Sequence, residues 1–304
     1  MRIFLTGATG YVGSAVLDSF VRNGHEVSAL VRTPEKAEQV SQRGVHPVVG
    51  DLARPETYDT VAEECDAIVH TALDGKNAAA IDRAAIDALL GAATRRADSL
   101  RPGAFVYTSG VWVLGNTSGP ADENVSIDPP DLVKWRPEHE ALVLRSGRGK
   151  SLRPIVLRPG IVYGGARGII GDLLKQGLNG LLRVVGNGQN HWPCVYDRDL
   201  GDLYVRLVTS PDASGTFHAN DEADETVGDI VEAIAGQAKM RPDVRHVPID
   251  ELRKKLGAYA DALALDQIVR SPRARALGWA PTLHSVSANV PRLLEEFRNQ
   301  REAA

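Results

Sequence analysis

Three glycines near the start of the chain have the spacing of a dinucleotide-binding turn. They occur as Gly7-x-x-Gly10-x-x-Gly13, directly after the apolar residues 2–6 and directly before a helical pattern. In a strand–turn–helix unit, the first glycine allows a tight turn, the second lets the backbone approach a pyrophosphate, and the third allows close helix–strand packing. The N-terminus of the helix then offers unpaired N–H groups and a partial positive charge to phosphates. The residues between the glycines that we also expect to contact the dinucleotide are Thr9, Tyr11 and Val12.

The end of the second predicted strand, at residues 25–31, indicates which dinucleotide binds. NAD-binding units usually place an acid at this point to bind the adenosine ribose 2′-hydroxyl. Here Val31 occupies the position and Arg32 follows it. A guanidinium can bind a 2′-phosphate with two hydrogen bonds and stack on adenine, so the sequence predicts NADP as cofactor, with Lys36 as a second ligand of the phosphate. The alternative is an arginine that is merely solvated at a strand end.

Strands and helices alternate through the first half of the chain. Apolar runs typical of buried strands lie at residues 45–49, 65–71, 104–108 and 154–157. Helical patterns alternate with them, in a short segment that begins at residue 34, at residues 78–96 and near residues 137–144. This alternation predicts an α/β fold with a doubly wound parallel sheet and helices on both faces. We predict a dinucleotide-binding core at residues 1–163. Residues 164–304 are expected to form mainly a smaller C-terminal substrate-binding lobe, from which the chain crosses back to the core.

The composition argues against several partners and sites. The 304 residues include 39 acidic and 35 basic side chains, so no basic surplus indicates nucleic-acid binding. No apolar stretch approaches the ~20 residues of a membrane helix, and the N-terminus lacks a secretory pattern. Cys65 and Cys194 are far apart in the sequence, which favours reduced thiols and a cytoplasmic protein. No residues have metal-ligand spacing, so we expect no metal.

Several segments together resemble one protein family. They are residues 6–13 (TGATGYVG), 70–72 (HTA), 158–164 (RPGIVYG), 195–200 (VYDRDL) and 277–281 (LGWAP). They are similar to the short-chain dehydrogenase/reductase superfamily, in its extended or atypical branch described as NAD-dependent epimerase/dehydratase, and the similarity covers nearly the whole chain. It implies a Rossmann core and a small-molecule substrate. The further cofactor contacts that the resemblance implies are Asp51, Leu52, Thr71, Ala72, Thr108, Pro159 and Ile161.

The expected catalytic centre departs from the pattern of that family. The family uses Tyr-x-x-x-Lys after the fifth strand, where the lysine holds the nicotinamide ribose and the tyrosine transfers a proton. Here Trp135 stands at the tyrosine position and His139 at the lysine position. An indole N–H cannot transfer a proton near neutral pH, whereas histidine titrates there. The family's serine aligns with Gly110, so its neighbour Ser109 either presents a hydroxyl to the substrate carbonyl or only contacts the cofactor.

We predict Tyr163 as the replacement proton donor, because the segment after the sixth strand runs beside the substrate pocket in this family. Ser109 would orient the carbonyl, and His139 would hold the ribose or donate a proton itself. The alternative for Tyr163 is a packing role. The sequence therefore predicts an NADP-dependent oxidoreductase that transfers a hydride to or from a small carbonyl or alcohol, with a non-standard proton donor. An epimerase or dehydratase with the same cofactor, and a non-catalytic NADP-binding sensor or regulator, remain as alternatives.

Two further features concern the substrate and the assembly. His191 lies near the place where sugar-nucleotide epimerases have an arginine, and histidine is a poor substitute for a bidentate phosphate ligand. Trp112, Trp135 and Trp192 favour a smaller apolar or aromatic carbonyl compound. The helix expected at residues 78–96 is rich in alanine on more than one face, which predicts a homodimer built on this helix.

Overall fold

The centre of the molecule is a seven-stranded sheet in the order β10-β6-β5-β4-β1-β2-β3. All its strands run parallel. The computed structural model describes residues 1–96, 103–149, 152–237 and 241–302. The strand order reverses between β1 and β4, so the predicted doubly wound parallel sheet is confirmed. The strands are β1 (Arg2–Thr6), β2 (Glu26–Val31), β3 (His46–Val49), β4 (Ala67–His70), β5 (Gly103–Thr108), β6 (Leu152–Pro159) and β10 (Gly215–Ala219).

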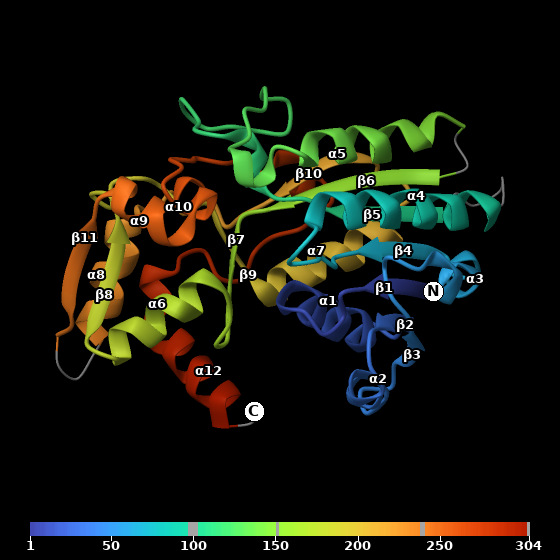
Figure 1. Cartoon of the computed structure of the whole chain (residues 1–304), viewed down its shortest axis with the longest axis horizontal. Helices are drawn as coiled ribbons and strands as arrows, with labels where there is room; N and C mark the ends of the chain where they lie inside the picture. The colour runs from blue at the N-terminus through green and yellow to red at the C-terminus, as the bar shows by residue number, and fades with distance from the viewer. Residues whose placement is uncertain (97–102, 150–151, 238–240, 303–304) are drawn as a thin grey trace.

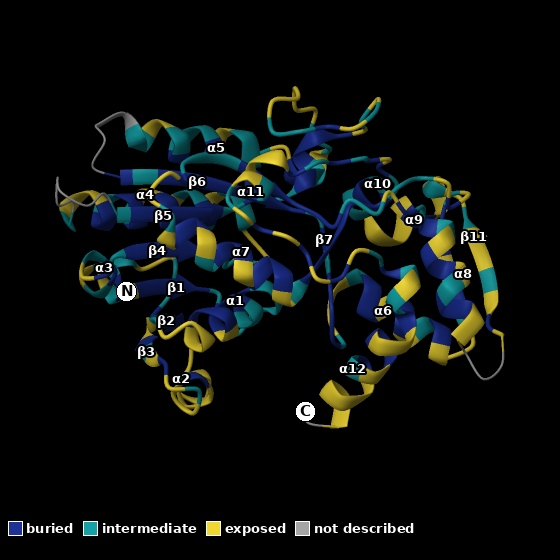
Figure 2. Cartoon of the chain, turned by 180° about the vertical axis from the view of Figure 1, so that it is seen from behind, coloured by how far each residue is buried: buried dark blue, intermediate teal, exposed yellow. Residues whose placement is uncertain are grey.

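Helices cover both faces of this sheet (Figure 1). One face carries α1 (Tyr11–Arg22), α2 (Pro34–Ser41) and α7 (Asp197–Thr209), and the other carries α3 (Asp59–Glu63), α4 (Ala78–Arg96) and α5 (Arg136–Arg145). Successive side chains of a strand point to opposite faces, so Ile3 and Leu5 enter the first core and Phe4 enters the second. This explains why the strands are apolar at almost every position. Figure 2 shows the central strands buried between the two helix layers.

A second lobe extends from the carboxyl end of β6. Two small parallel sheets pair β7 with β9 and β8 with β11. The apolar side chains of this lobe form a separate buried cluster that includes Tyr163, Ile230 and Phe297. Its elements are β7 (Ile161–Tyr163), α6 (Gly168–Leu178), β8 (Leu181–Val185), β9 (Cys194–Tyr196), α8 (Val227–Gln237), β11 (Asp243–Val247), α9 (Ile249–Leu256), α10 (Ala258–Leu263) and α12 (Val290–Glu302).

The chain does not stay in the second lobe once it has entered it. It returns to the central sheet and then enters the second lobe again. The helix α7 packs its Leu200 and Leu203 into the same core as Val16 and Leu17 of α1. The strand β10 then extends the sheet beside β6. Trp279 donates its indole N–H to the backbone oxygen of Asp199, 2.8 Å away, and so fixes the segment after α11 (Pro272–Ala276) to α7. The division of the chain at residue 163 stays a prediction.

The long helix α4 has the predicted bounds, and its exposed side is only partly apolar. Arg83 forms ion pairs there with Asp87 of the same helix and with Glu138 of α5. The homodimer stays a prediction. Among the described residues, no helix combines the length and the apolar character that a membrane span requires.

Candidate cofactor and substrate site

The glycine turn joins β1 to α1 with very little free space. Gly7 has φ 77°, in the region that favours glycine, and its carbonyl accepts a hydrogen bond from the N–H of Gly10 at 2.8 Å. A Cβ added at Gly13 would lie 2.0 Å from the oxygen of Gly7. A Cβ added at Gly7 would lie 2.7 Å from Oγ1 of Thr71 and from the N atom of Ala72. The turn therefore requires glycine at both positions.

The N-terminus of α1 is open to a ligand. No side chain caps the helix, no acidic residue occupies its first turn, and Tyr11 and Val12 border a cavity at the strand ends. The first N–H groups of a helix have no partners within the helix, so they suit a phosphate. Thr71 follows β4 and donates its hydroxyl to the oxygen of Thr6 at 2.7 Å, which fixes the neighbouring strand end. These residues fit the diphosphate of a dinucleotide.

Arg32 is exposed at the carboxyl end of β2, where the sequence predicts the adenosine end of the cofactor. The pKa of Asp74, after β4, is lowered by hydrogen bonds from the N–H groups of Asn77 and Lys76 and also by the charge of Arg32. Arg32 thus faces the same edge of the sheet as the glycine turn. Lys36 instead donates its Nζ to Gln39 at 3.0 Å along the exposed helix α2.

The other expected contacts at the adenosine end follow β3. Asp51 uses one carboxylate oxygen to accept the N–H of Ala53 at 2.9 Å, and Leu52 packs against the core beneath the sheet. The second carboxylate oxygen of Asp51 makes no hydrogen bond within the described residues. Asp51 is therefore held in one orientation and keeps an acceptor for a ligand.

A cavity of about 530 Å³ lies between the two lobes, at the carboxyl ends of β5 and β6. Its walls are largely apolar, and they include Pro159 and Ile161, which the sequence predicts as cofactor contacts. Trp192 lies outside it, because this indole borders a neighbouring cavity of about 930 Å³ and donates its N–H to the oxygen of Leu263. The large side chains that line the first cavity include Trp112, Leu132, Trp135, Ile169 and Tyr259.

Ser109 is one of the residues that line this cavity. The residue follows β5 and is held by its N–H, which donates to the oxygen of Leu157 at 2.8 Å. Its Oγ is buried and has no hydrogen-bond partner among the described residues. A buried hydroxyl without a partner is destabilising by about 1–3 kcal/mol, so this atom suits a ligand oxygen. Thr108, one residue earlier, instead bonds its hydroxyl to that of Tyr204 at 2.5 Å.

His139 lies in a buried network on α5. Its Nδ1 is 2.7 Å from Oδ2 of Asp82 on α4, and Asp82 also binds Nε2 of His70 at 3.2 Å and the hydroxyl of Tyr107 at 2.8 Å. Burial opposes the ionisation of Asp82, but the hydrogen bonds from His139 and His70 outweigh it and hold the pKa of this carboxyl well below its usual range. His139 is not among the residues that line the cavity. The structure thus places His139 in the network behind the cavity, and its contact with the ribose or the substrate stays a prediction.

Tyr163 also lies outside the cavity. Its side chain is fully buried in the second lobe, and its hydroxyl lies 3.2 Å from Oδ2 of Asp221 and 3.3 Å from the oxygen of Leu283. Burial and the charge of Asp221 raise the pKa of Tyr163 above its ordinary value. The predicted position beside the substrate is wrong, because pairing of β7 with β9 sets Tyr163 opposite Tyr196 inside the lobe.

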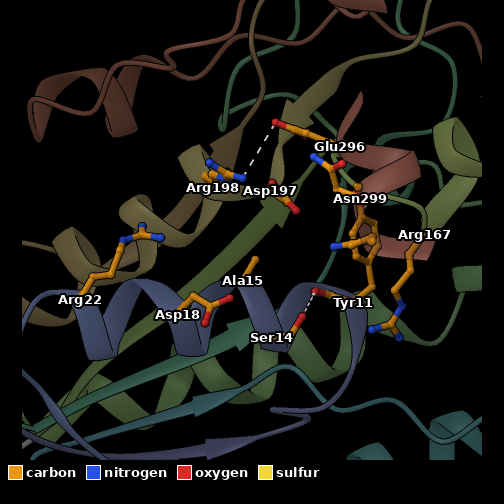
Figure 3. Close-up of a pocket in the computed structure, with 12 residues that line it drawn as sticks. Tyr11, Ser14, Ala15, Asp18, Arg22, Arg167, Asp197, Arg198, Glu296 and Asn299 are labelled. Atoms are coloured by element: carbon orange, nitrogen blue, oxygen red, sulfur yellow. Dashed lines mark hydrogen bonds and ion pairs between the residues drawn. The ribbon is translucent and has the colours of Figure 1, made fainter. Parts of the chain in front are cut away.

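A third, polar cavity of about 620 Å³ lies on the other side of Tyr11 from the first, between α1, α7 and α12 (Figure 3). Tyr11 donates its hydroxyl to the oxygen of Gly164 at 2.8 Å and so separates the two cavities. Asp197 has a buried Oδ1 without a partner among the described residues. Burial, with the nearby charge of Glu296, raises the pKa of Asp197 to about 6.

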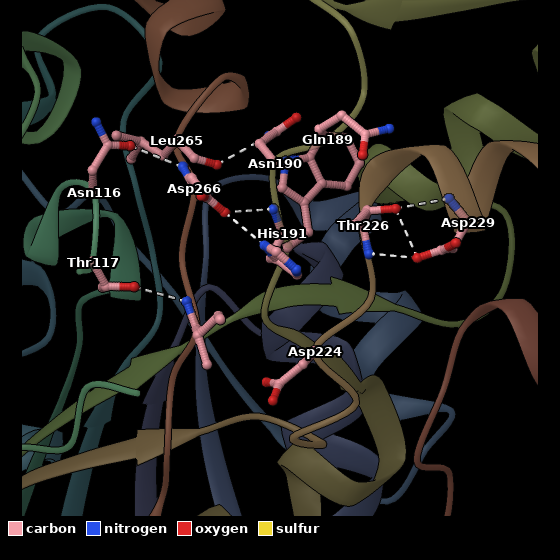
Figure 4. Close-up of polar contacts among 12 residues, drawn as sticks. Asn116, Thr117, Gln189, Asn190, His191, Asp224, Thr226, Asp229, Leu265 and Asp266 are labelled. Atoms are coloured by element: carbon pink, nitrogen blue, oxygen red, sulfur yellow. Dashed lines mark hydrogen bonds and ion pairs between the residues drawn. The ribbon is translucent and has the colours of Figure 1, made fainter. Parts of the chain in front are cut away.

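His191 holds three loops together. Its Nδ1 and its backbone N each lie 2.8 Å from Oδ1 of Asp266 (Figure 4). The backbone N of Asp266 donates to Oδ1 of Asn116 at 2.9 Å, and Thr117 accepts the N–H of Ile268. His191, which lies near the position of the arginine of sugar-nucleotide epimerases, therefore already contacts the carboxylate of Asp266.

Sequence reasoning missed Arg136 and Asp82. Arg136 lines the cavity, and Asp82 organises the buried network behind it. Asp82 left a signal in the sequence, since it is a charged residue on the buried side of an alanine-rich helix. The sequence contains no comparable signal for Arg136, apart from its position next to Trp135.

The fold and this site define a class, the doubly wound proteins that bind a dinucleotide at the carboxyl ends of their strands. The model of the NAD dependent epimerase/dehydratase family matches residues 3–220. The chain belongs to this family, so the resemblance in the sequence is confirmed. Its cofactor is a nicotinamide dinucleotide.

Known proteins similar to this chain include both sequence relatives and solved structures. Uncharacterized protein YLL056C of Saccharomyces cerevisiae is 31% identical over 294 residues, which cover 92% of this chain and 95% of that protein. The 4-hydroxy-2-methyl-3-oxo-4-farnesyl-3,4-dihydroquinoline-1-oxide ketoreductase of Stigmatella aurantiaca is 31% identical over 173 residues, 54% of this chain and 51% of the ketoreductase. A structure of human epimerase family protein SDR39U1 with NADPH has a TM-score of 0.78 and 21% identity, covering 97% and 99% of the two chains.

Proposed function

We propose that the protein is an NADP-dependent oxidoreductase that interconverts a small apolar or aromatic carbonyl compound and its alcohol. The observation that carries the proposal is the buried hydroxyl of Ser109, unpartnered among the described residues; Ser109 lies in the wall of an apolar cavity at the strand ends. A carbonyl oxygen would give this hydroxyl its missing acceptor, and the indoles of Trp112 and Trp135 would contact the apolar body of the substrate. The similarity to a ketoreductase, and the NADPH in the SDR39U1 structure, support it.

The residues of the chain have distinct roles in this proposal. The N-terminus of α1 and its glycine turn would hold the diphosphate, and Arg32 would bind the 2′-phosphate. A bound nicotinamide dinucleotide supplies or accepts a hydride. Of the two phenols that line the cavity, Tyr11 donates to Gly164, and Tyr259 has no hydrogen bond within the described residues. Tyr259 is the proposed proton donor because its hydroxyl is the one without a hydrogen-bond partner among the described residues, and burial raises its pKa.

Ser109→Ala tests the proposal. With purified protein, NADPH and a panel of aryl and alkyl ketones, we expect kcat/KM to fall by about 10²–10³-fold, because the oxygen loses a preorganised donor. Tyr259→Phe should also lower turnover. Tyr163→Phe is the matched control and should keep its turnover, since its hydroxyl lies inside the second lobe. Full turnover in Ser109→Ala would contradict the assignment, and NADPH binding without reduction of any ketone would favour a sensor.

NADP preference is tested by Arg32→Ala. Calorimetry should show a loss on the order of 1–3 kcal/mol in NADPH binding, because the phosphate loses a charged hydrogen-bond partner, with little change for NADH. Lys36→Ala should have a smaller effect, since its amine already bonds Gln39. Equal affinity of the wild type for NADPH and NADH would contradict the preference.

A further inference from the structure

Arg136 is the first residue of α5 and is fixed at one end of its guanidinium. Its Nη1 donates to the oxygen of Thr108 at 3.0 Å and to the hydroxyl of Tyr107 at 3.2 Å. Its Cζ lies 4.6 Å from the ring centroid of Trp135, so the planar group also rests on an indole. The guanidinium therefore has a defined place at the cavity wall.

The other end of the guanidinium is free for a ligand. In the part of the chain that the structure describes, Nε and Nη2 of Arg136 make no hydrogen bond, and no carboxylate lies within ion-pair distance. Arg136 is half-buried and lines the same cavity as Ser109, Leu132 and Trp135. By contrast, the buried Arg158 is paired with the carboxylate of Glu140. A cation against apolar walls is costly without a partner, so an anionic or strongly polar ligand would stabilise it.

The buried network behind the cavity orients Arg136. Tyr107 donates its proton to Oδ2 of Asp82 at 2.8 Å, and its oxygen is thereby left to accept from Arg136. Asp82 is held in turn by His139 and His70. His139, at the position of the family's lysine, thus helps to orient Arg136. Arg136 lies three residues earlier on the same helix and lines the cavity.

We propose that Arg136 binds the substrate oxygen together with Ser109 and stabilises negative charge on it. The inference rests on the proposed function. When a hydride adds to the carbonyl carbon, the electron pair of the C=O π bond moves to the oxygen. The resulting alkoxide is stabilised by the guanidinium and takes a proton from Tyr259, which solvent reprotonates. Arginine stays protonated, so Arg136 supplies charge and no proton. The same site should accept aromatic carboxylates, whose two oxygens match the two free nitrogens of the guanidinium, Nε and Nη2.

Benzoate is a probe of this site that requires no turnover. Calorimetry with saturating NADP⁺ should show that the wild type binds benzoate and that Arg136→Met and Arg136→Gln bind it at least about tenfold more weakly. Arg136→Gln retains a donor for Thr108, so it separates the loss of charge from the loss of the anchor. Arg83→Met is the matched control, because Arg83 forms exposed ion pairs outside the cavity, and it should bind like the wild type. NADPH affinity and melting temperature of the glutamine variant should match the wild type.

Kinetics with acetophenone provide a second readout. In Arg136→Gln, kcat should fall by about 10²–10³-fold with a smaller change in KM, which a merely structural role would not produce. Failure of the wild type to bind benzoate, or equal binding by Arg136→Gln, would overturn the inference. If benzoate binding depends on Arg136 but no ketone is reduced, the proposed function fails and the anion site stands.

Discussion

Gly13→Ala is expected to remove dinucleotide binding and to lower the stability of the protein. The added Cβ would lie 2.0 Å from the oxygen of Gly7 and 2.6 Å from its carbonyl carbon. Both atoms belong to the backbone of the turn, so α1 must move away from β1 to relieve the contact. Overpacking of this kind costs about 1–3 kcal/mol or more, and the shift also displaces the helix N-terminus that would hold the diphosphate. Thermal unfolding and NADPH calorimetry measure the two effects.

Gly236→Ala is the matched control for this variant. Gly236 lies in α8, and a Cβ there would meet no atom within 4 Å. Alanine favours a helix by about 1 kcal/mol over glycine, so the control should be as stable as the wild type or more so. NADPH binding by Gly13→Ala with wild-type affinity would show that the turn does not bind the cofactor.

Asp82→Asn is expected to lower the free energy of unfolding by about 3–5 kcal/mol, as when one partner of a buried charged network is removed. The carboxylate accepts hydrogen bonds from His70, His139 and Tyr107, all of them buried. An amide has only one acceptor oxygen and turns its NH₂ group toward donors. Urea unfolding measures the change. The variant should also lose activity through Arg136, whose anchor Tyr107 would lose its own acceptor.

The effect of Asp82→Asn should depend on pH in a defined direction. The pKa of Asp82 is lowered in the folded protein, so its charge stabilises the fold above the unfolded pKa of about 4. This stability is lost as the pH falls from about 4 toward the folded pKa, and the difference between wild type and variant should shrink there. Asp87→Asn, on the exposed side of the same helix, should change stability by less than about 1 kcal/mol at any pH. A constant difference for Asp82→Asn down to strong acid would contradict the role of its charge.

Much of the fold was predictable because its signals are local. The apolar run at residues 2–6, the glycine turn and the helical spacing after it lie within one short segment, and they form β1 and α1 as expected. The bounds of α4 matched as well. The pattern at residues 286–297 predicts a final helix there, but α12 begins at Val290. The carboxylate of Glu225 binds the N–H groups of Val286 and Ser287 and holds them in a separate turn. That contact joins residues about sixty positions apart, and no local pattern contains it.

The site was less predictable for the same reason. Ser109 could be placed because it directly follows a strand of the sheet. Tyr163 also comes shortly after a strand of the sheet, but it belongs to β7, which pairs with β9 in the second lobe. The pairing of β7 with β9 is not visible in the sequence. His139 was assigned from its place in a family motif, whereas its direction depends on Asp82, which comes from another helix.

The return of the chain to the central sheet limits how the molecule can be divided. A protein cut after Tyr163 would lack α7, and the apolar side chains of α1 that pack against Leu203 would face water. It would also lack β10, so the backbone of β6 would become an open edge able to pair with other chains. The second lobe is therefore not a continuous segment that can be exchanged at a single junction. To transfer the specificity of a relative to this protein, at least two segments must be exchanged, namely residues 161–196 before α7 and the segments after β10. The helix α7 and the strand β10 between them must remain those of this protein.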